Sequence, residues 1–283
     1  MRKFGFLMAL LAVVFGAGGA LLRGQEIETV FDPVSGLAVR GAPISIALIV
    51  LSVATVGALF GLSFTVRQIR AGSFADAFGK HIFVRVLLIL AGIVASGFSV
   101  VELLGATEMG GLQTAQALVA VAAGILGLVL MAVLGAKGNR AAIPAVVPVF
   151  WLCLWLVSAH VGDQAANPVL LSYVYQLFTL ASLLLSFYYI AGYAFSQERP
   201  GRLMFSCSTA VYFTLVTLPD NWSTPQQVVL LVLAGTVLIY QLALSGQRAD
   251  PAMTRQSWAD PPATEEPYRD EGVWHPDQEG ADA

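Results

Sequence analysis

Charged residues are scarce in this 283-residue chain. Asp, Glu, Lys and Arg make up 12% of it, whereas hydrophobic residues make up 57%. Soluble domains carry roughly 25% charged residues. The composition therefore excludes an ordinary soluble domain and indicates an integral membrane protein. Basic patches with interleaved aromatic residues are also lacking, so we expect no nucleic-acid partner.

Cysteine and histidine are rare as well. The two cysteines, Cys153 and Cys207, both lie in apolar segments, which excludes a framework of structural disulfides. The three histidines, His81, His160 and His275, lie far apart in the chain and form no metal-ligand pattern. We therefore predict no metal site.

Catalytic and nucleotide-binding motifs are absent too. The chain has no His-Glu-x-x-His pair, no Gly-x-Ser-x-Gly elbow, no Walker A loop and no Gly-x-Gly-x-x-Gly loop. It also lacks a paired acidic motif that could hold Mg²⁺ against a diphosphate. We expect no cofactor, and an enzyme is disfavoured because no residues for its chemistry can be named.

Long apolar runs dominate what is present. Eight of them have roughly the length that crosses a bilayer. They predict an all-α fold, a polytopic bundle of about eight transmembrane helices within residues 1–245. The predicted spans are 4–22, 43–65, 82–103, 113–135, 143–160, 169–195, 203–218 and 226–245.

The placement of Lys and Arg predicts the orientation of this bundle. With both termini in the cytoplasm, 13 of the 15 basic residues fall on the cytoplasmic side, and only Arg23 and Arg40 fall outside. Such a bias is typical of proteins of the plasma (cytoplasmic) membrane. One alternative stays open: residues 1–20 also resemble a cleaved signal peptide, which would leave seven helices. Leu21 and Leu22 argue against it, because they continue the apolar run.

Two segments lie outside the predicted spans and are long enough to matter. Residues 23–42 form the longest predicted loop, on the outer side. Residues 246–283 hold nine of the 18 acidic residues and are rich in proline, so we predict a disordered acidic cytoplasmic tail. Trp258, Tyr268 and Trp274 could dock a cytoplasmic partner there, although an unselected tail is the favoured interpretation.

Small residues suggest where helices approach each other closely. Gly57 and Gly61 have the GxxxG spacing, and Gly61 shares a helix face with Ala47, Ala54 and Ala58. We favour helix–helix contact within the chain at this face, with a homo-oligomer as the alternative. The lipid bilayer is the one partner that the sequence predicts directly.

A polar stripe marks the sixth predicted span. Polar side chains recur there at spacings of three and four, which puts them on one face of a helix. This face predicts contact with other helices or with a wet passage. Its members are Ser172, Gln176, Thr179, Ser182, Ser186, Tyr189 and Tyr193.

Glu102 is the clearest ionisable residue at predicted membrane depth. A carboxylate there is costly, so it would face the bundle or a wet site, with Thr214 or Thr217 as a neighbour. The predicted ligand or ion pathway comprises Glu102, Gln176, Thr179, Ser182, Ser186, Tyr189 and Thr214.

Two classes of function remain open on these grounds. A small-solute transporter or ligand-binding permease fits the polar stripe and Glu102. A membrane sensor or assembly subunit without an internal site fits the outer loop and the tail. We favour the first class, and the sequence names no substrate.

Overall fold

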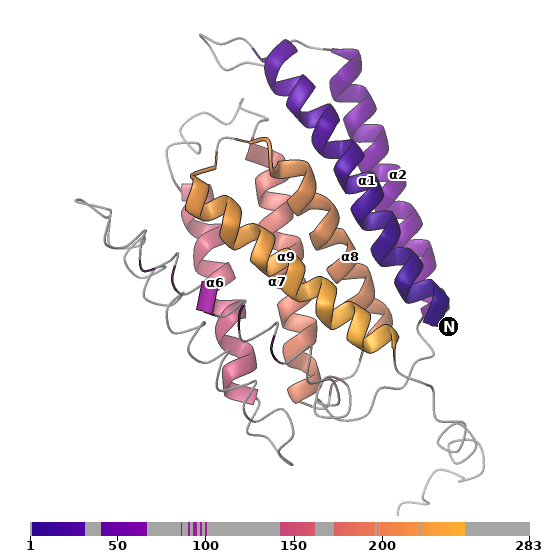
Figure 1. The fold of residues 1–283 in the computed structure, drawn as a ribbon, viewed down its shortest axis with the longest axis vertical. Helices are drawn as coiled ribbons and strands as arrows, with labels where there is room; N and C mark the ends of the chain where they lie inside the picture. The colour runs from indigo at the N-terminus through magenta and orange to yellow at the C-terminus, as the bar shows by residue number, and fades with distance from the viewer. Residues whose placement is uncertain are drawn as a thin grey trace, which may run out of the picture. The chain divides into compact units, whose positions relative to one another are not determined.

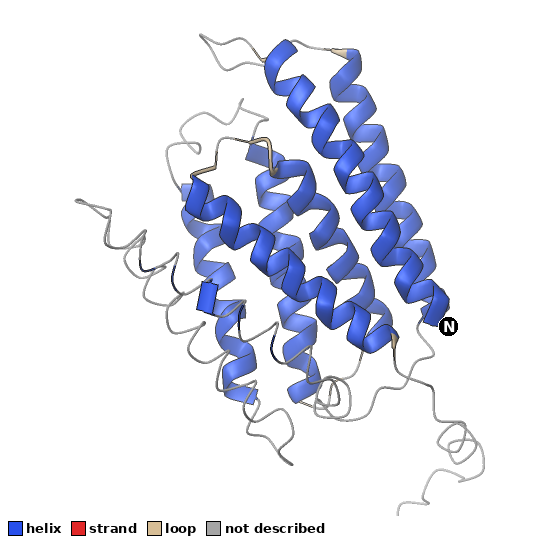
Figure 2. Cartoon of the chain, viewed as in Figure 1, coloured by secondary structure: helices blue, strands red, loops and turns tan. Residues whose placement is uncertain are grey.

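Helices form every regular element that the structure describes. The computed structural model describes residues 2–31, 41–66, 142–161, 173–195, 197, 199–220 and 222–246, with a few isolated positions between 86 and 100. The helices are α1 (Arg2–Thr29), α2 (Pro43–Val66), α6 (Ala142–Val161), α7 (Val174–Ala194), α8 (Pro200–Thr217) and α9 (Thr224–Ser245) (Figures 1 and 2). The predicted all-α class is confirmed for this part of the chain.

Four of these helices are long and apolar enough to cross a membrane. They are Phe4–Thr29 in α1, Pro43–Val66 in α2, Val174–Ala194 in α7 and Gln226–Ser245 in α9. The count of eight spans stays a prediction. Most of the third and fourth predicted spans, Glu102, and the tail beyond Gly246 lie outside the described residues.

The first helix differs from the predicted one. α1 continues to Thr29, seven residues beyond the predicted end at residue 22. Arg23 and Glu26 therefore lie on the helix rather than in the predicted outer loop. The reason is that both side chains are buried and paired, so their charges do not end the helix.

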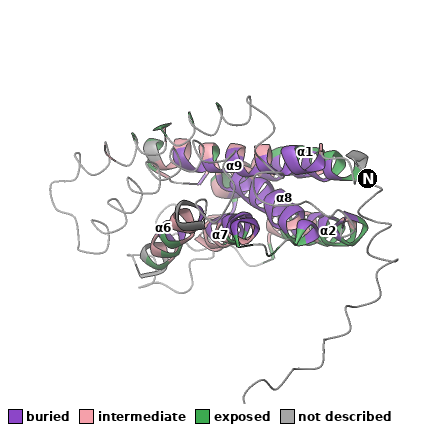
Figure 3. Ribbon diagram, turned by 90° about the horizontal axis from the view of Figure 1, so that it is seen from below, coloured by how far each residue is buried: buried purple, intermediate pink, exposed green. Residues whose placement is uncertain are grey.

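α8 is the central helix of the described part. It packs against α1, α2, α7 and α9, and 15 of its 18 residues are buried (Figure 3). The buried residues include Ser206, Ser208, Thr209, Thr214 and Thr217, so this enclosed helix carries several polar side chains. Polar groups here must find partners inside the protein.

The helices on either side of α8 keep an apolar outer surface. α1 and α2 expose large hydrophobic side chains that a soluble protein would bury, among them Phe6, Val14, Leu21, Val53 and Phe64. Such a surface is expected where helices face lipid. It agrees with the membrane assignment drawn from composition.

Glycines bring α1 into close contact with α8 and α9. A Cβ added to Gly19 would lie 2.6 Å from Val216, one added to Gly16 would lie 2.9 Å from Leu215, and one added to Gly5 would lie 2.6 Å from Ser245. The predicted small-residue face of α2 behaves differently. Gly57 and Gly61 meet nothing within 4 Å, and Ala47, Ala54 and Ala58 are exposed. The intrachain contact predicted for this face is therefore not seen in the described part, because α2 buries Leu48, Ser52, Thr55 and Leu59 instead.

We expect Gly19→Ala to destabilise the bundle by about 1–3 kcal/mol, because the added methyl overpacks the contact with the β-branched Val216. Gly18 is the matched control: a Cβ there meets nothing within 4 Å. Gly18→Ala should be neutral or stabilising by up to about 1 kcal/mol, since alanine favours a helix. Thermal unfolding of the two variants in detergent tests the contact, and equal melting temperatures would contradict it.

Candidate functional site

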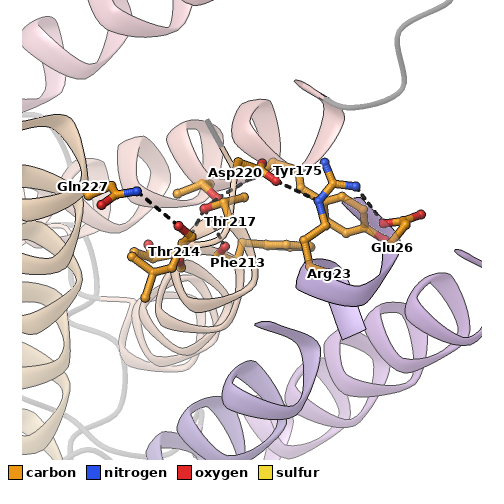
Figure 4. Close-up of polar contacts among 10 residues, drawn as sticks. Arg23, Glu26, Tyr175, Phe213, Thr214, Thr217, Asp220 and Gln227 are labelled. Carbon is orange, nitrogen blue, oxygen red and sulfur yellow. Dashed lines mark hydrogen bonds and ion pairs between the residues drawn. The ribbon is translucent and has the colours of Figure 1, made fainter. Parts of the chain in front are cut away.

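Three charged side chains are buried together at one end of α1. Arg23 is 1% exposed, Glu26 is 6% exposed and Asp220 is 5% exposed. Arg23 donates from Nε to Asp220 Oδ1 over 2.8 Å and from Nη1 to Glu26 Oε2 over 2.7 Å. We call Arg23, Glu26 and Asp220 the ion cluster. Figure 4 shows the guanidinium lying between the two carboxylates.

The local fold explains how these residues meet. Arg23 and Glu26 are three residues apart on α1, so both project from one side of the helix. Asp220 comes from the turn after α8, where its N–H donates to Thr217 and its carbonyl accepts from Trp222. Ser223 then opens α9 with a capping box formed with Gln226. Asp220 is thus fixed by a helix end on one side and a helix start on the other.

Aromatic rings complete the surroundings of the guanidinium. Arg23 Cζ lies 5.2 Å from the centre of the Tyr175 ring and 5.6 Å from that of the Phe31 ring. Both distances are within the range of cation–π attraction. Tyr175 belongs to α7, so the side chain of Arg23 joins α1, α7 and the turn after α8.

The electrostatics of the ion cluster are unbalanced among the described residues. One guanidinium faces two carboxylates, which leaves one excess negative charge in a buried place. Burial raises the pKa of Asp220 above its usual value, and this outweighs the lowering by Arg23 and by the Gln176 side chain. Asp220 Oδ2 is buried and accepts no hydrogen bond of ordinary geometry from the residues that the structure describes. The cluster is therefore suited to take up a proton or a second cation.

The predicted pathway residues on α7 fall into two groups. Gln176 and Thr179 lie toward the ion cluster. The Gln176 side chain lowers the pKa of the Asp220 carboxyl. The Thr179 hydroxyl lies 3.2 Å from the Thr217 hydroxyl on α8. Ser182, Ser186 and Tyr189 continue along α7 away from Asp220. Ser182 and Ser186 are buried, and Tyr189 is half-buried. The predicted polar face of this helix is thus directed at the protein, while its role as a pathway stays a prediction.

The hydroxyls along this face are largely satisfied within their own helix. Thr179 donates to Tyr175 over 2.9 Å, Ser182 donates to Thr179 over 3.0 Å, and Ser186 donates to Ser182 over 2.7 Å. Bonds of this kind let a polar side chain stay buried without a ligand. They weaken the case that the middle of the stripe lines a wet passage.

Thr214 and Glu102 have different outcomes. Thr214 is fully buried on α8, and its Oγ1 has no hydrogen-bond partner among the described residues. Glu102 lies outside the described residues, so its predicted neighbours are not tested. Of the predicted pathway, the structure brings Gln176, Thr179 and Thr214 toward the end of α8 that carries Asp220.

A second polar connection joins the middle of α8 to the C-terminal part of α9. The Gln241 amide donates to Ser208 Oγ over 2.8 Å and to the carbonyl of Gly5 over 3.2 Å. Gln241 is completely buried and joins α1, α8 and α9. Since it connects neutral groups that satisfy one another, its role is structural.

Sequence patterns alone assign no functional role to the members of the ion cluster. Arg23 and Glu26 fall in the predicted outer loop 23–42, and Asp220 falls between the predicted spans 203–218 and 226–245. Two signals were available: Arg23 and Glu26 have helical spacing directly after an apolar run, and Asp220 follows another such run. The described residues contain no group of three or more His, Cys, Asp and Glu that could hold a metal ion.

Comparison with protein families, with curated proteins and with solved structures gives no match. Function must therefore be inferred from the residues themselves.

Proposed function

We propose that this protein is a multi-pass membrane protein that transports or binds a small solute, and that the ion cluster couples this activity to a proton. The observation that carries the proposal is the burial of two carboxylates against a single guanidinium. Burial of charged groups carries a desolvation cost, and carboxylates whose pKa burial shifts are concentrated at functional sites. In a purely structural ion pair, one carboxylate would be enough to neutralise the guanidinium.

The position of the ion cluster supports coupling. It connects α1 with the turn between α8 and α9, and Tyr175 adds α7. Protonation of Asp220 would remove the negative charge that attracts Arg23 from the turn after α8 and so weaken the ion pair between them. A change of one proton would thus alter the contact between helices, which is what a coupled transporter needs.

We further propose that the protein lies in the plasma membrane with both termini in the cytoplasm, on the basis of the Lys and Arg bias. The ion cluster would then lie near the outer surface. A reporter that is active only outside the cytoplasm should be silent when fused after Ala283, and an active fusion would contradict this orientation.

A membrane sensor or assembly subunit is the second candidate. The observation that favours it is the set of internally satisfied hydroxyls on α7, since these need no ligand and leave α7 and α8 packed together. In that case the ion cluster would report external pH without moving a solute.

Solute-dependent proton movement separates the two candidates. The full-length protein is placed in liposomes that contain a pH-sensitive dye, and amines, amino acids and sugars are added singly. We expect at least one class to cause a protein-dependent pH change, which Asp220→Asn should reduce by tenfold or more, on the order of one lost charged interaction. Glu28→Gln is the matched control, because Glu28 is an exposed carboxylate on α1, two residues after Glu26. If no class moves protons, the transport proposal fails.

A further inference from the structure

We propose that the surroundings of the Arg23 guanidinium form a recognition site for an organic cation, with the Arg23 side chain as a tethered occupant that a solute replaces. This inference deepens the proposed function and rests on it for the statement that the solute is transported. The binding step rests on the contacts of Arg23 alone.

The contacts of Arg23 are those that recognise a planar cation. Its guanidinium meets a carboxylate on each of two sides, from α1 and from the turn after α8, at 2.7 Å and 2.8 Å. The rings of Phe31 and Tyr175 lie within 5.6 Å of its central carbon. Carboxylates that accept hydrogen bonds, together with aromatic faces, favour a delocalised organic cation over a compact, strongly hydrated metal ion.

The two carboxylates of the site outnumber its one guanidinium, and this charge favours the binding of a second cation. Among the described residues that face Arg23, Glu26 on α1 and Asp220 after α8 are acidic, whereas Tyr175 on α7 is a phenol. Within the described part of the chain, Asp220 Oδ2 also lacks a hydrogen bond of ordinary geometry although the side chain is 3% exposed. An incoming guanidinium or alkylammonium group could use this oxygen while Arg23 keeps its bond to Glu26.

Tethering explains why Arg23 can act as an occupant rather than as fixed structure. The guanidinium is attached to α1 by a flexible chain of methylene groups, so it can leave Asp220 without any movement of the helix. When a soluble cation replaces Arg23 at Asp220, the ion pair that connects α1 to the turn between α8 and α9 is broken.

Chemical rescue tests the site independently of transport. Arg23→Ala removes the occupant, and the full-length variant in lipid nanodiscs is titrated with guanidinium or methylguanidinium chloride at millimolar concentrations. We expect a saturable rise in melting temperature of roughly 3–5 °C at about ten times the dissociation constant. Urea is the matched control, because it has the same planar shape without the charge, and sodium chloride controls for ionic strength. Neither should reproduce the effect.

A second variant decides whether the carboxylates are the binding groups. In Arg23→Ala combined with Asp220→Asn, the guanidinium effect should fall at least fivefold. An equal effect of guanidinium and urea, or an undiminished effect in the double variant, would overturn the inference. If Arg23→Ala does not fold, Arg23→Gln undergoes the same titration with the same criteria. Rescue without any solute-dependent proton movement in liposomes would support the site and reject only the transport proposal.

Discussion

Replacing Arg23 with methionine is expected to cost about 3–5 kcal/mol of stability at neutral pH, because it leaves two buried carboxylates without their shared cation. Methionine keeps much of the volume and the apolar stem of the side chain, so little of this cost comes from a cavity. Arg23 is 1% exposed, and water cannot readily replace the lost partner. Chemical unfolding in detergent, followed by tryptophan fluorescence, measures the loss.

Asp220→Asn is the informative comparison for this prediction. It removes the excess negative charge and leaves Arg23 with Glu26, and the asparagine oxygen can still accept from Arg23 Nε. The expected cost is below about 1.5 kcal/mol, the value of a typical hydrogen bond. Glu28→Gln, at an exposed position on the same helix, should be close to neutral. If Asp220→Asn costs as much as Arg23→Met, the idea of an excess carboxylate is wrong.

The polar face of α7 shows what the sequence could predict. Thr179, Ser182 and Ser186 recur at helical spacing within an apolar run, and a helix of that kind must direct its polar face toward protein. The structure buries all three residues. The spacing of these residues predicts their burial correctly because the side chains that share a helix face are determined by the local sequence alone.

The ion cluster shows what local patterns could not predict. An arginine directly after an apolar run usually marks the end of a membrane span, so the pattern predicts a loop position for Arg23. Its burial depends on Asp220, which lies 197 residues away in the chain. A pairing between residues so distant is a tertiary event, and no spacing rule reveals it.

The glycine spacing likewise does not predict which helices are in contact. The GxxxG spacing of Gly57 and Gly61 permits close approach, but it does not say which helix approaches. In the described part, Gly16 and Gly19 on α1, three residues apart, approach α8 closely, and Gly5 approaches α9. The shape of α8 determines which helix face it packs against, because Leu215 and Val216 fill the space that the glycines of α1 leave.

Acidification is expected to stabilise the wild-type protein relative to Asp220→Asn. Burial raises the pKa of Asp220 in the folded state above its ordinary value of 3.8, so the folded protein binds this proton more tightly than the unfolded chain does. The stabilising contribution is therefore fully present below about pH 3.8 and is lost as the pH rises through the raised pKa of the folded state.

Melting temperatures measured from pH 4 to pH 8 in detergent test this expectation. Other carboxylates titrate over the same range in both proteins, so the quantity that matters is the difference between wild type and Asp220→Asn. This difference should shift in favour of Asp220→Asn as the pH rises, by about 1.4 kcal/mol for each unit by which the pKa of Asp220 is raised. Glu28→Gln should run parallel to wild type, since that carboxylate is exposed. A difference that shifts toward wild type would mean that Arg23 lowers the pKa of Asp220 more than burial raises it, and the ion cluster would then be a structural pair with no proton to exchange near neutral pH.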